Sequence, residues 1–393
     1  MKRIFKNLFF IVLCCSCIFG VYGLNSFLGV DEELSLKSAP KLSVVVPVYN
    51  VSPYLDEALN SVENQTYKDM EIICINDGST DNSLEILENH AKKDSRIKII
   101  NQENRGVSAA RNAGIDVAGG KYVYFFDSDD ILAPYIMGTS IDLLEKNDAD
   151  ILEFRYLRRL FDEKVDFSEY SYDPSLVQIC EREQGENPFK AFEGTIKVWA
   201  CVYRKSFLTE NSVRFSEDVK ISEDVLFNFM CRPYIKKMIK DANIGYCYRT
   251  KRPGSAVTEN HESTRTHIEN DLKVVIKIIS FRDTLKFKSR DIDEYIASYV
   301  ISLVHGQWVN IGNVKSVYDR RQLAAMAYEA IGKNFVEKYN IKVSSDDKKR
   351  LDDLKYRFEN KKIDRKNDKK TQVKGRLASK PKKQPKKSSN KRG

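Results

Sequence analysis

The chain has 393 residues, of which 42% are hydrophobic and 31% are charged, and this composition excludes a wholly disordered chain and a polytopic membrane protein. Its formal net charge of +9 is unevenly distributed, because residues 361–393 carry +13 and residues 1–6 carry +3. Residues 7–360 are therefore acidic, with a net charge of −7, and the overall basicity does not by itself indicate a nucleic-acid partner.

The N-terminal segment is apolar and uncharged from residue 7 to residue 30. As a helix, it is long enough to span a hydrocarbon core of about 30 Å. A basic start followed by an apolar stretch is also typical of a secretory signal peptide. We therefore predict that residues 1–30 are a retained single-pass signal anchor in a membrane, with a cleaved signal peptide and secretion as the alternative, and that residues 31–40 are a linker.

The region 41–150 alternates between two kinds of pattern. Near-continuous apolar runs predict buried strands at 42–49, 71–75, 97–100 and 121–126. Apolar residues at helical spacing predict helices at 53–64, 81–93 and 106–118. This alternation is typical of an α/β fold with a mostly parallel sheet flanked by helices, which binds ligands at the carboxyl ends of its strands.

Carboxylates follow two of these predicted strands. Asp77 follows the second strand, and Asp127, Asp129 and Asp130 directly follow the fourth. Three aspartates so close together repel one another unless a cation lies among them, and their oxygens suit Mn²⁺ or Mg²⁺. Such an ion also binds diphosphate oxygens, so we expect a nucleotide partner. The alternative is a solvated acidic turn that caps the following segment.

The turn after the first predicted strand lacks a glycine-rich phosphate-binding loop. The phosphates are therefore expected to be held by the metal ion and by basic side chains. Arg105 and Arg111, which flank the turn into the third predicted helix, are the candidates for that contact.

Four segments occur in a fixed order along this region: Pro47-Val-Tyr-Asn50, Asn76-Asp-Gly-Ser-Thr-Asp81, Gly106-Val-Ser-Ala-Ala-Arg-Asn-Ala-Gly114 and Phe126-Asp-Ser-Asp-Asp130. The series closely resembles the GT-A glycosyltransferases of family 2. The resemblance implies a GT-A fold with a Rossmann-like sheet, a nucleotide-diphosphate-sugar donor and an inverting transfer. One departure is small: many members carry Asp at the position of Asn76.

By this resemblance, six residues would contact the donor or its metal ion: Pro47, Tyr49, Asp77, Asp127, Asp129 and Asp130. The first three would line the pocket for the nucleobase and the ribose. Asp127 and Asp129 would be the DxD pair that reaches the ribose and the metal ion. The region 41–150 would thus be the nucleotide-sugar-binding half of the domain.

A second carboxylate pair lies in the region 151–260, at Glu223 and Asp224, where an apolar helix-like stretch begins. On the pattern alone, these acids either cap a helix or supply the base that activates an acceptor hydroxyl. Family members often carry a Glu-Asp pair here as part of the acceptor side. The resemblance therefore favours Asp224 as the general base and makes Glu223 the second choice.

Two further segments of the region 151–260 match the family more loosely. Trp199 lies in a segment that precedes the acidic pair in relatives, and it is a candidate for the acceptor wall. Tyr248-Arg249 and Arg252-Pro-Gly-Ser255 resemble a loop that closes over the donor diphosphate. The histidines and cysteines of the chain show no catalytic, zinc-binding or disulfide pattern.

The region 261–358 has apolar residues at helical spacing and is predicted to be helical, without a recognisable motif. Residues 359–393 form a basic tail that is too polar to build a core and is expected to be disordered. Together with the N-terminal segment it could contact anionic lipid headgroups, and without aromatic residues it is not expected to bind nucleic acid.

The function favoured by the sequence is metal-dependent, inverting sugar transfer from a UDP-sugar to a glycan or lipid-linked hydroxyl acceptor. A catalytically inactive carbohydrate-binding or scaffolding domain of the same fold is the alternative. A nucleotidyltransferase shares the layout and the metal requirement, but it would need a glycine-rich basic loop after the first strand.

Overall fold

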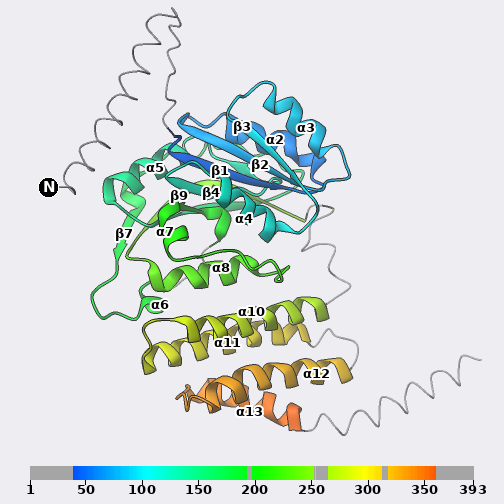
Figure 1. Ribbon diagram of the computed structural model, residues 1–393, viewed down its shortest axis with the longest axis vertical. Coiled ribbons are helices and arrows are strands. Elements are labelled where there is room, and N and C mark those ends of the chain that lie inside the picture. Colours follow the sequence, from blue (N-terminus) through cyan, green and yellow to red (C-terminus); the bar gives the residue numbers. More distant parts are fainter. Residues whose placement is uncertain (1–38, 193–196, 252, 254–263, 312–316, 360–393) are drawn as a thin grey trace, which may run out of the picture. The chain divides into compact units, whose positions relative to one another are not determined.

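The structure is a computed structural model that describes residues 39–192, 197–251, 253, 264–311 and 317–359 (Figure 1). Among these residues, nine strands form one sheet in the order β3-β2-β1-β4-β8-β6-β9-β5, with β7 paired to β9. The strands are β1 Leu42–Val48, β2 Met70–Asp77, β3 Ile97–Gln102, β4 Tyr122–Phe125, β5 Ile131–Leu132, β6 Ile151–Leu160, β7 Val177–Glu181, β8 Cys201–Arg204 and β9 Lys237–Thr250.

Helices connect these strands and make up most of the described chain after β9. The α-helices are α2 Ser52–Glu63, α3 Ser83–Ala91, α4 Val107–Val117, α5 Ile136–Asn147, α6 Pro188–Ala191, α7 Lys205–Glu210, α8 Glu223–Cys231, α10 Thr264–Thr284, α11 Arg290–Ile311, α12 Val317–Ala327 and α13 Ser345–Glu359. A π-helix, η5 Tyr328–Glu337, lies between α12 and α13.

The first four strands confirm the predicted α/β fold class. β1 pairs in parallel with both β2 and β4, and β2 pairs in parallel with β3. Beyond β4 the sheet becomes mixed, because β8 runs antiparallel to its neighbours β4 and β6. A strand from the second half of the predicted domain therefore lies inside the sheet, and both halves share one hydrogen-bonded framework.

The apolar run at β1 lacks alternation because both of its faces are buried. Val44 and Val46 pack into the cluster that includes α2 and α5, whereas Val45 packs into the cluster that includes α4 and α8. The motif residue Gly114 allows α4 to approach β1 closely, since a Cβ there would lie 2.2 Å from Cγ1 of Val45. The conformation of this motif is thus set by packing against β1.

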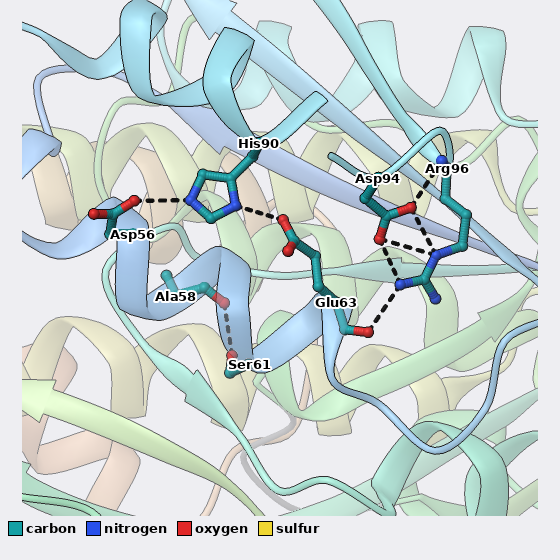
Figure 2. Close-up of polar contacts among 7 residues, drawn as sticks. All are labelled: Asp56, Ala58, Ser61, Glu63, His90, Asp94 and Arg96. Carbon is teal, nitrogen blue, oxygen red and sulfur yellow. Dashed lines mark hydrogen bonds and ion pairs between the residues drawn. The ribbon is translucent and has the colours of Figure 1, made fainter. Parts of the chain in front are cut away.

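His90 ties α3 to α2 on the same side of the sheet (Figure 2). Its Nδ1 lies 2.5 Å from Oε1 of Glu63, and its Nε2 lies 2.8 Å from Oδ1 of Asp56. Arg96, the residue directly before β3, donates to the main-chain carbonyl of Glu63 and pairs with Asp94. This histidine, for which the sequence offered no catalytic pattern, joins two helices.

The predicted helical region is confirmed between residues 264 and 359. Its apolar core gathers α10, α11, α12, η5 and α13, and it extends to Leu226 and Phe229 of α8. Ser222, next to α8, also donates a hydrogen bond to Asp271 of α10 at 2.8 Å. The helix that carries the predicted base is therefore held by the helical region on one side and by the sheet on the other.

The two ends of the chain fall largely outside the described residues. This applies to the predicted anchor over residues 1–30 and to the predicted basic tail beyond Glu359. Within the part of the chain that the structure describes, no helix is long and apolar enough to cross a membrane.

Candidate active site

The loops that follow β1 and β2 are joined by hydrogen bonds. Oδ1 of Asn50 accepts from the main-chain N–H of Thr80 at 2.8 Å, and Oγ of Ser83 accepts from the N–H of Val51 at 3.1 Å. Asp81 accepts from the N–H groups of Ser52 and Ser83, each at 3.0 Å. The first two motif segments therefore form one structural unit at the carboxyl ends of adjacent parallel strands. 

Two of the predicted nucleobase residues belong to this unit but differ in exposure. Pro47 lies within β1 and is buried, whereas the side chain of Tyr49 follows the strand and is 46% exposed. An exposed phenol ring at the end of a central strand is available to a ligand. The proposed donor contacts of both residues stay predictions.

Asp77 ends β2 and is 3% exposed. Its Oδ1 accepts from Nε2 of Gln102 at 2.7 Å and from the N–H of Arg105 at 2.9 Å, and its Oδ2 accepts from the N–H of Gly106 at 2.8 Å. Gly106 has a φ of +90°, in the left-handed region that glycine adopts most readily. Asp77 therefore shapes the turn into α4, where the third motif segment begins.

Arg111 of α4 connects the turn after β4 to the start of α8. Its Nη2 lies 2.8 Å from Oδ1 of Asp127, which follows β4, and its Nη1 lies 2.9 Å from Oε1 of Glu223, the first residue of α8. The arginine is 3% exposed, and its guanidinium lies over the ring of Phe215 with 5.2 Å to the centroid. Both Nη atoms of this arginine, which the sequence predicts as a phosphate contact, are thus paired with carboxylates.

For Asp127, Glu223 and Arg111, burial and the opposite charge of the ion-pair partner shift the pKa in opposite directions. Burial raises the pKa of Asp127, Arg111 opposes that rise, and the charge of Asp129 adds to it. The pKa of Glu223 is raised by burial as well, again opposed by Arg111 and increased by the charge of Asp224. For Arg111 burial would lower the pKa, but the two carboxylates outweigh it and raise the pKa above its ordinary value.

Asp130, the third acid of the cluster, points into the protein. It is fully buried, and its carboxylate accepts from the hydroxyl of Tyr246 at 2.5 Å and from the N–H of Arg249 at 2.7 Å. Burial raises its pKa well above the ordinary range, and the charges of Asp129 and Asp127 raise it further. Its contacts join the β4–β5 turn to β9, and its predicted place in the donor site stays a prediction.

Asp129 is half-buried, and with Asp127 it would supply the carboxylate oxygens for the divalent ion that the fold family implies. Within the described ranges, no group of three or more His, Cys, Asp or Glu side chains forms a complete metal site. Mg²⁺ is commonly bound by one or two carboxylates together with substrate phosphates and water. The two carboxylates therefore fit an ion that arrives with a diphosphate, and the mutual repulsion within the acidic cluster favours such a cation.

Asp224 lies next to Glu223 in the first turn of α8, which begins after Ser222 with a φ of +65°. Its Oδ2 is 3.5 Å from Nζ of Lys197, and the side chain is 18% exposed. The charge of Asp224 contributes to the raised pKa of Asp127, so the two carboxylates interact electrostatically. The structure brings together the predicted base and the predicted DxD pair, which are far apart in the sequence.

Trp199 is 7% exposed and lies in an aromatic stack. Its ring centroid is 4.6 Å from that of Tyr246 and 5.4 Å from that of Tyr248, and its carbonyl accepts from the hydroxyl of Tyr124 at 2.7 Å. This packing makes Trp199 mainly a core residue. The half-buried Tyr248 is the more exposed member of the stack.

The predicted diphosphate loop is described only at its start. The side chain of Arg249 pairs with Glu57 of α2 and lies over the ring of Tyr54, at 5.9 Å from its centroid. Arg252 and residues 254–255 lie outside the described residues. The sequence did not predict the contact of Lys197 with Asp224 or the pairing of Arg111 with Glu223, because neither contact follows from a local pattern.

Comparisons with known proteins agree with this arrangement. The family model described as glycosyl transferase family 2 matches residues 43–197. Glycosyltransferase GlyG of Streptococcus pneumoniae serotype 4 is 32% identical over 224 residues, which cover 54% of this chain and 72% of that protein. The uncharacterized glycosyltransferase EpsJ of Bacillus subtilis is 35% identical over 195 residues, which cover 48% of this chain. This chain spans 55% of the length of EpsJ.

Among solved structures, S. aureus TarS 1–349 in complex with UDP has a TM-score of 0.61 and 20% sequence identity. The match covers 82% of this chain and 88% of that one. The same protein in complex with UDP-GlcNAc has a TM-score of 0.59 over 74% of this chain and 81% of that one, at 21% identity. At this level of identity, the similarity shows a shared GT-A fold.

Proposed function

Because the chain belongs to glycosyl transferase family 2, we propose that it transfers a sugar from a nucleotide-diphosphate donor to an acceptor hydroxyl, with inversion at the anomeric carbon. The observation that carries this proposal is that carboxylates from two distant parts of the chain lie at one site. Asp127 and Asp129 lie at the end of β4, and Asp224 lies at the start of α8, bridged to them through Arg111 and Glu223.

We propose a UDP-sugar as the donor. The protein TarS, which shares the fold, has been solved with UDP and with UDP-GlcNAc. Tyr49 and Asp77 stand at adjacent strand ends, where α/β sheets of this kind bind nucleotides. A glycan or a lipid-linked hydroxyl compound is proposed as the acceptor, on the chemistry of the transfer alone.

In the proposed reaction, the acceptor oxygen forms a bond to the anomeric carbon while the bond to the diphosphate oxygen breaks. The electron pair of the broken bond leaves with the nucleoside diphosphate, and the carboxylate of Asp224 takes the proton of the acceptor hydroxyl. When bound at Asp129 and Asp127, Mn²⁺ or Mg²⁺ would neutralise charge on the leaving diphosphate. The ammonium group of Lys197 lies 3.5 Å from the base and compensates its negative charge.

The test is a screen of nucleotide-sugar turnover by the full chain in mild detergent, with Mn²⁺ or with a chelator. We expect release of UDP from a UDP-sugar in the presence of Mn²⁺, and a loss of that release with Asp129→Asn or with chelator. The matched control is Asp218→Asn, which changes an exposed aspartate paired with Lys277 and should leave the rate unchanged. Binding of UDP without turnover of any donor would favour the inactive carbohydrate-binding domain instead.

Membrane attachment through residues 1–30, with a contribution from the basic tail over residues 359–393, is also proposed. The support is the sequence pattern of these two segments. Flotation with vesicles that contain anionic lipid tests it, and a chain that remains in the dense fraction at low salt would contradict it.

A further inference from the structure

Resting on the proposed function, we infer that Arg111 is a positioning residue that fixes the base-bearing end of α8 relative to the donor carboxylates. It would act on the reaction through Asp127 and Glu223, without contacting the sugar donor. The sequence predicted a phosphate contact for this arginine, and the geometry favours a different role.

The contacts of Arg111 come from three separate parts of the chain. The arginine belongs to α4, Asp127 follows β4, and Glu223 begins α8, 112 residues after the arginine. The ring of Phe215 lies against the guanidinium, and the same ring stacks on Phe227 of α8 with 3.9 Å between centroids. The guanidinium of Arg111 thus contacts the turn after β4 and both ends of the segment 215–223, which leads into α8.

The guanidinium is poorly placed to bind a diphosphate directly. The side chain is 4% exposed, and Nη1 and Nη2 make ion pairs of 2.9 and 2.8 Å with the two carboxylates. Its remaining nitrogen, Nε, is buried without a hydrogen-bond partner in the described structure. A phosphate contact would require at least one ion pair to break and the charge of a buried carboxylate to be left uncompensated.

The shape of arginine is what this role requires. A guanidinium presents several donors in a fixed plane and can hold two carboxylates at once, whereas a lysine ammonium is a compact charge on a flexible stem. Asp224 directly follows Glu223, so any shift of Glu223 moves the base as well. A displacement of a reacting group by about 1 Å can cost on the order of 100-fold in rate.

The experiment compares Arg111→Lys, Glu223→Gln and the double variant of the full chain, using the UDP-sugar that the screen identifies. We expect Arg111→Lys to lower kcat on the order of 100-fold. We expect the Kd of UDP with Mn²⁺, measured by calorimetry, to stay within about threefold, because a lysine keeps a positive charge beside Asp127 and the arginine itself makes no donor contact. The double variant should be no slower than the slower single variant, since both changes break the same bridge.

The matched control is Arg282→Lys in the helical region. Arg282 is likewise buried and paired with two carboxylates, Asp283 and Asp293. The lysine variant should lower the melting temperature to a similar extent while leaving kcat unchanged. Glu223→Gln keeps the size of the side chain and tests the same bridge if Arg111→Lys fails to fold.

Each other outcome overturns the inference in a distinct way. A rise of more than about tenfold in the Kd of UDP for Arg111→Lys would make the arginine a donor ligand. Rate losses that multiply in the double variant would show two independent roles. A loss of kcat no larger than in Arg282→Lys would make the role purely structural. If the wild-type chain turns over no nucleotide sugar, the proposed function fails first and the positioning role falls with it.

Discussion

Arg111 and Arg282 are two buried arginines that each hold two carboxylates, one in the α/β part of the molecule and one in the helical region. Arg282 of α10 pairs with the adjacent Asp283 at 2.9 Å and with Asp293 of α11 at 2.6 Å. Its partners lie at most 11 residues away, and its guanidinium lies 4.3 Å from the centroid of the Tyr339 ring. Arg111 instead joins elements that are 112 residues apart.

The difference shows what each buried charge accomplishes. In the helical region, the ion pair between Arg282 and Asp293 links the consecutive helices α10 and α11, which already share an apolar core. In the α/β part the arginine brings together acidic groups whose own burial is unfavourable and which surround the candidate site. The same chemistry therefore supports packing in one region and assembly of a site in the other.

The largest effect should follow from Asp224→Asn, which removes the proposed base while preserving the size of the side chain. We expect the transfer rate to fall on the order of 10³-fold, because an amide cannot take the proton of the acceptor hydroxyl. UDP binding should be retained. Initial rates with saturating donor measure this effect, and an unchanged rate would remove Asp224 from the mechanism.

Arg282→Met should be the largest change in stability outside the site. It leaves Asp293, whose side chain is 14% exposed, without its bidentate partner. We expect the free energy of unfolding to fall by about 3 kcal/mol, while kcat per folded molecule stays unchanged. Urea unfolding followed by circular dichroism measures the first quantity. A parallel loss of kcat would erase the contrast between the two arginines.

Asp77→Asn should have a smaller effect, concentrated on the donor. Oδ1 of Asp77 accepts from the N–H of Arg105 and Oδ2 accepts from the N–H of Gly106, but an amide has only one accepting oxygen, so one of these N–H groups loses its acceptor. We expect the Kd of UDP to rise roughly tenfold through a less ordered turn into α4. Calorimetry checks this, and unchanged binding would separate Asp77 from the donor site.

The smallest effect concerns the pH dependence of stability at Glu145 of α5, which is not part of the acidic cluster. Hydrogen bonds from Lys121 at 2.6 Å and from the hydroxyl of Tyr122 at 2.8 Å lower the pKa of this carboxyl from 4.5 to about 2. A depressed pKa stabilises the folded state above the unfolded value of 4.5, and this contribution is lost as the pH falls from 4.5 towards 2.

Glu145→Gln should therefore destabilise the chain at about pH 6 and converge with the wild type at about pH 2. Urea unfolding at several pH values measures the difference, with the exposed Glu88 changed to Gln as the control. A difference that is constant with pH would assign the effect to packing in place of charge.

The sequence predicted the fold well where structure is set locally. The strands at β1, β2, β3 and β4 and the helices between them lie within a few residues of their predicted positions, because buried apolar runs and helical spacing are short-range signals. The antiparallel pairing of β8 with β4 was not predictable, because β8 lies nearly 80 residues after β4 in the chain.

The site shows the same limit. The four motif segments place Asp77, Asp127 and Asp129 at strand ends, as expected. The inward orientation of Asp130 depends on Tyr246 and Arg249 of β9, which reach it only through the tertiary fold. No local pattern in one sequence relates these positions, and the same holds for the pairing of Arg111 with Glu223.

The most direct test of the central claim is proton NMR of the transferred sugar during turnover of the active UDP-sugar with Mn²⁺. One displacement, with Asp224 on the acceptor side and Asp127 and Asp129 on the leaving-group side, predicts a product with the opposite anomeric configuration to the donor. The signal of that product should disappear with Asp224→Asn. Retention of the donor configuration, or a product formed equally fast by Asp224→Asn, would contradict the account.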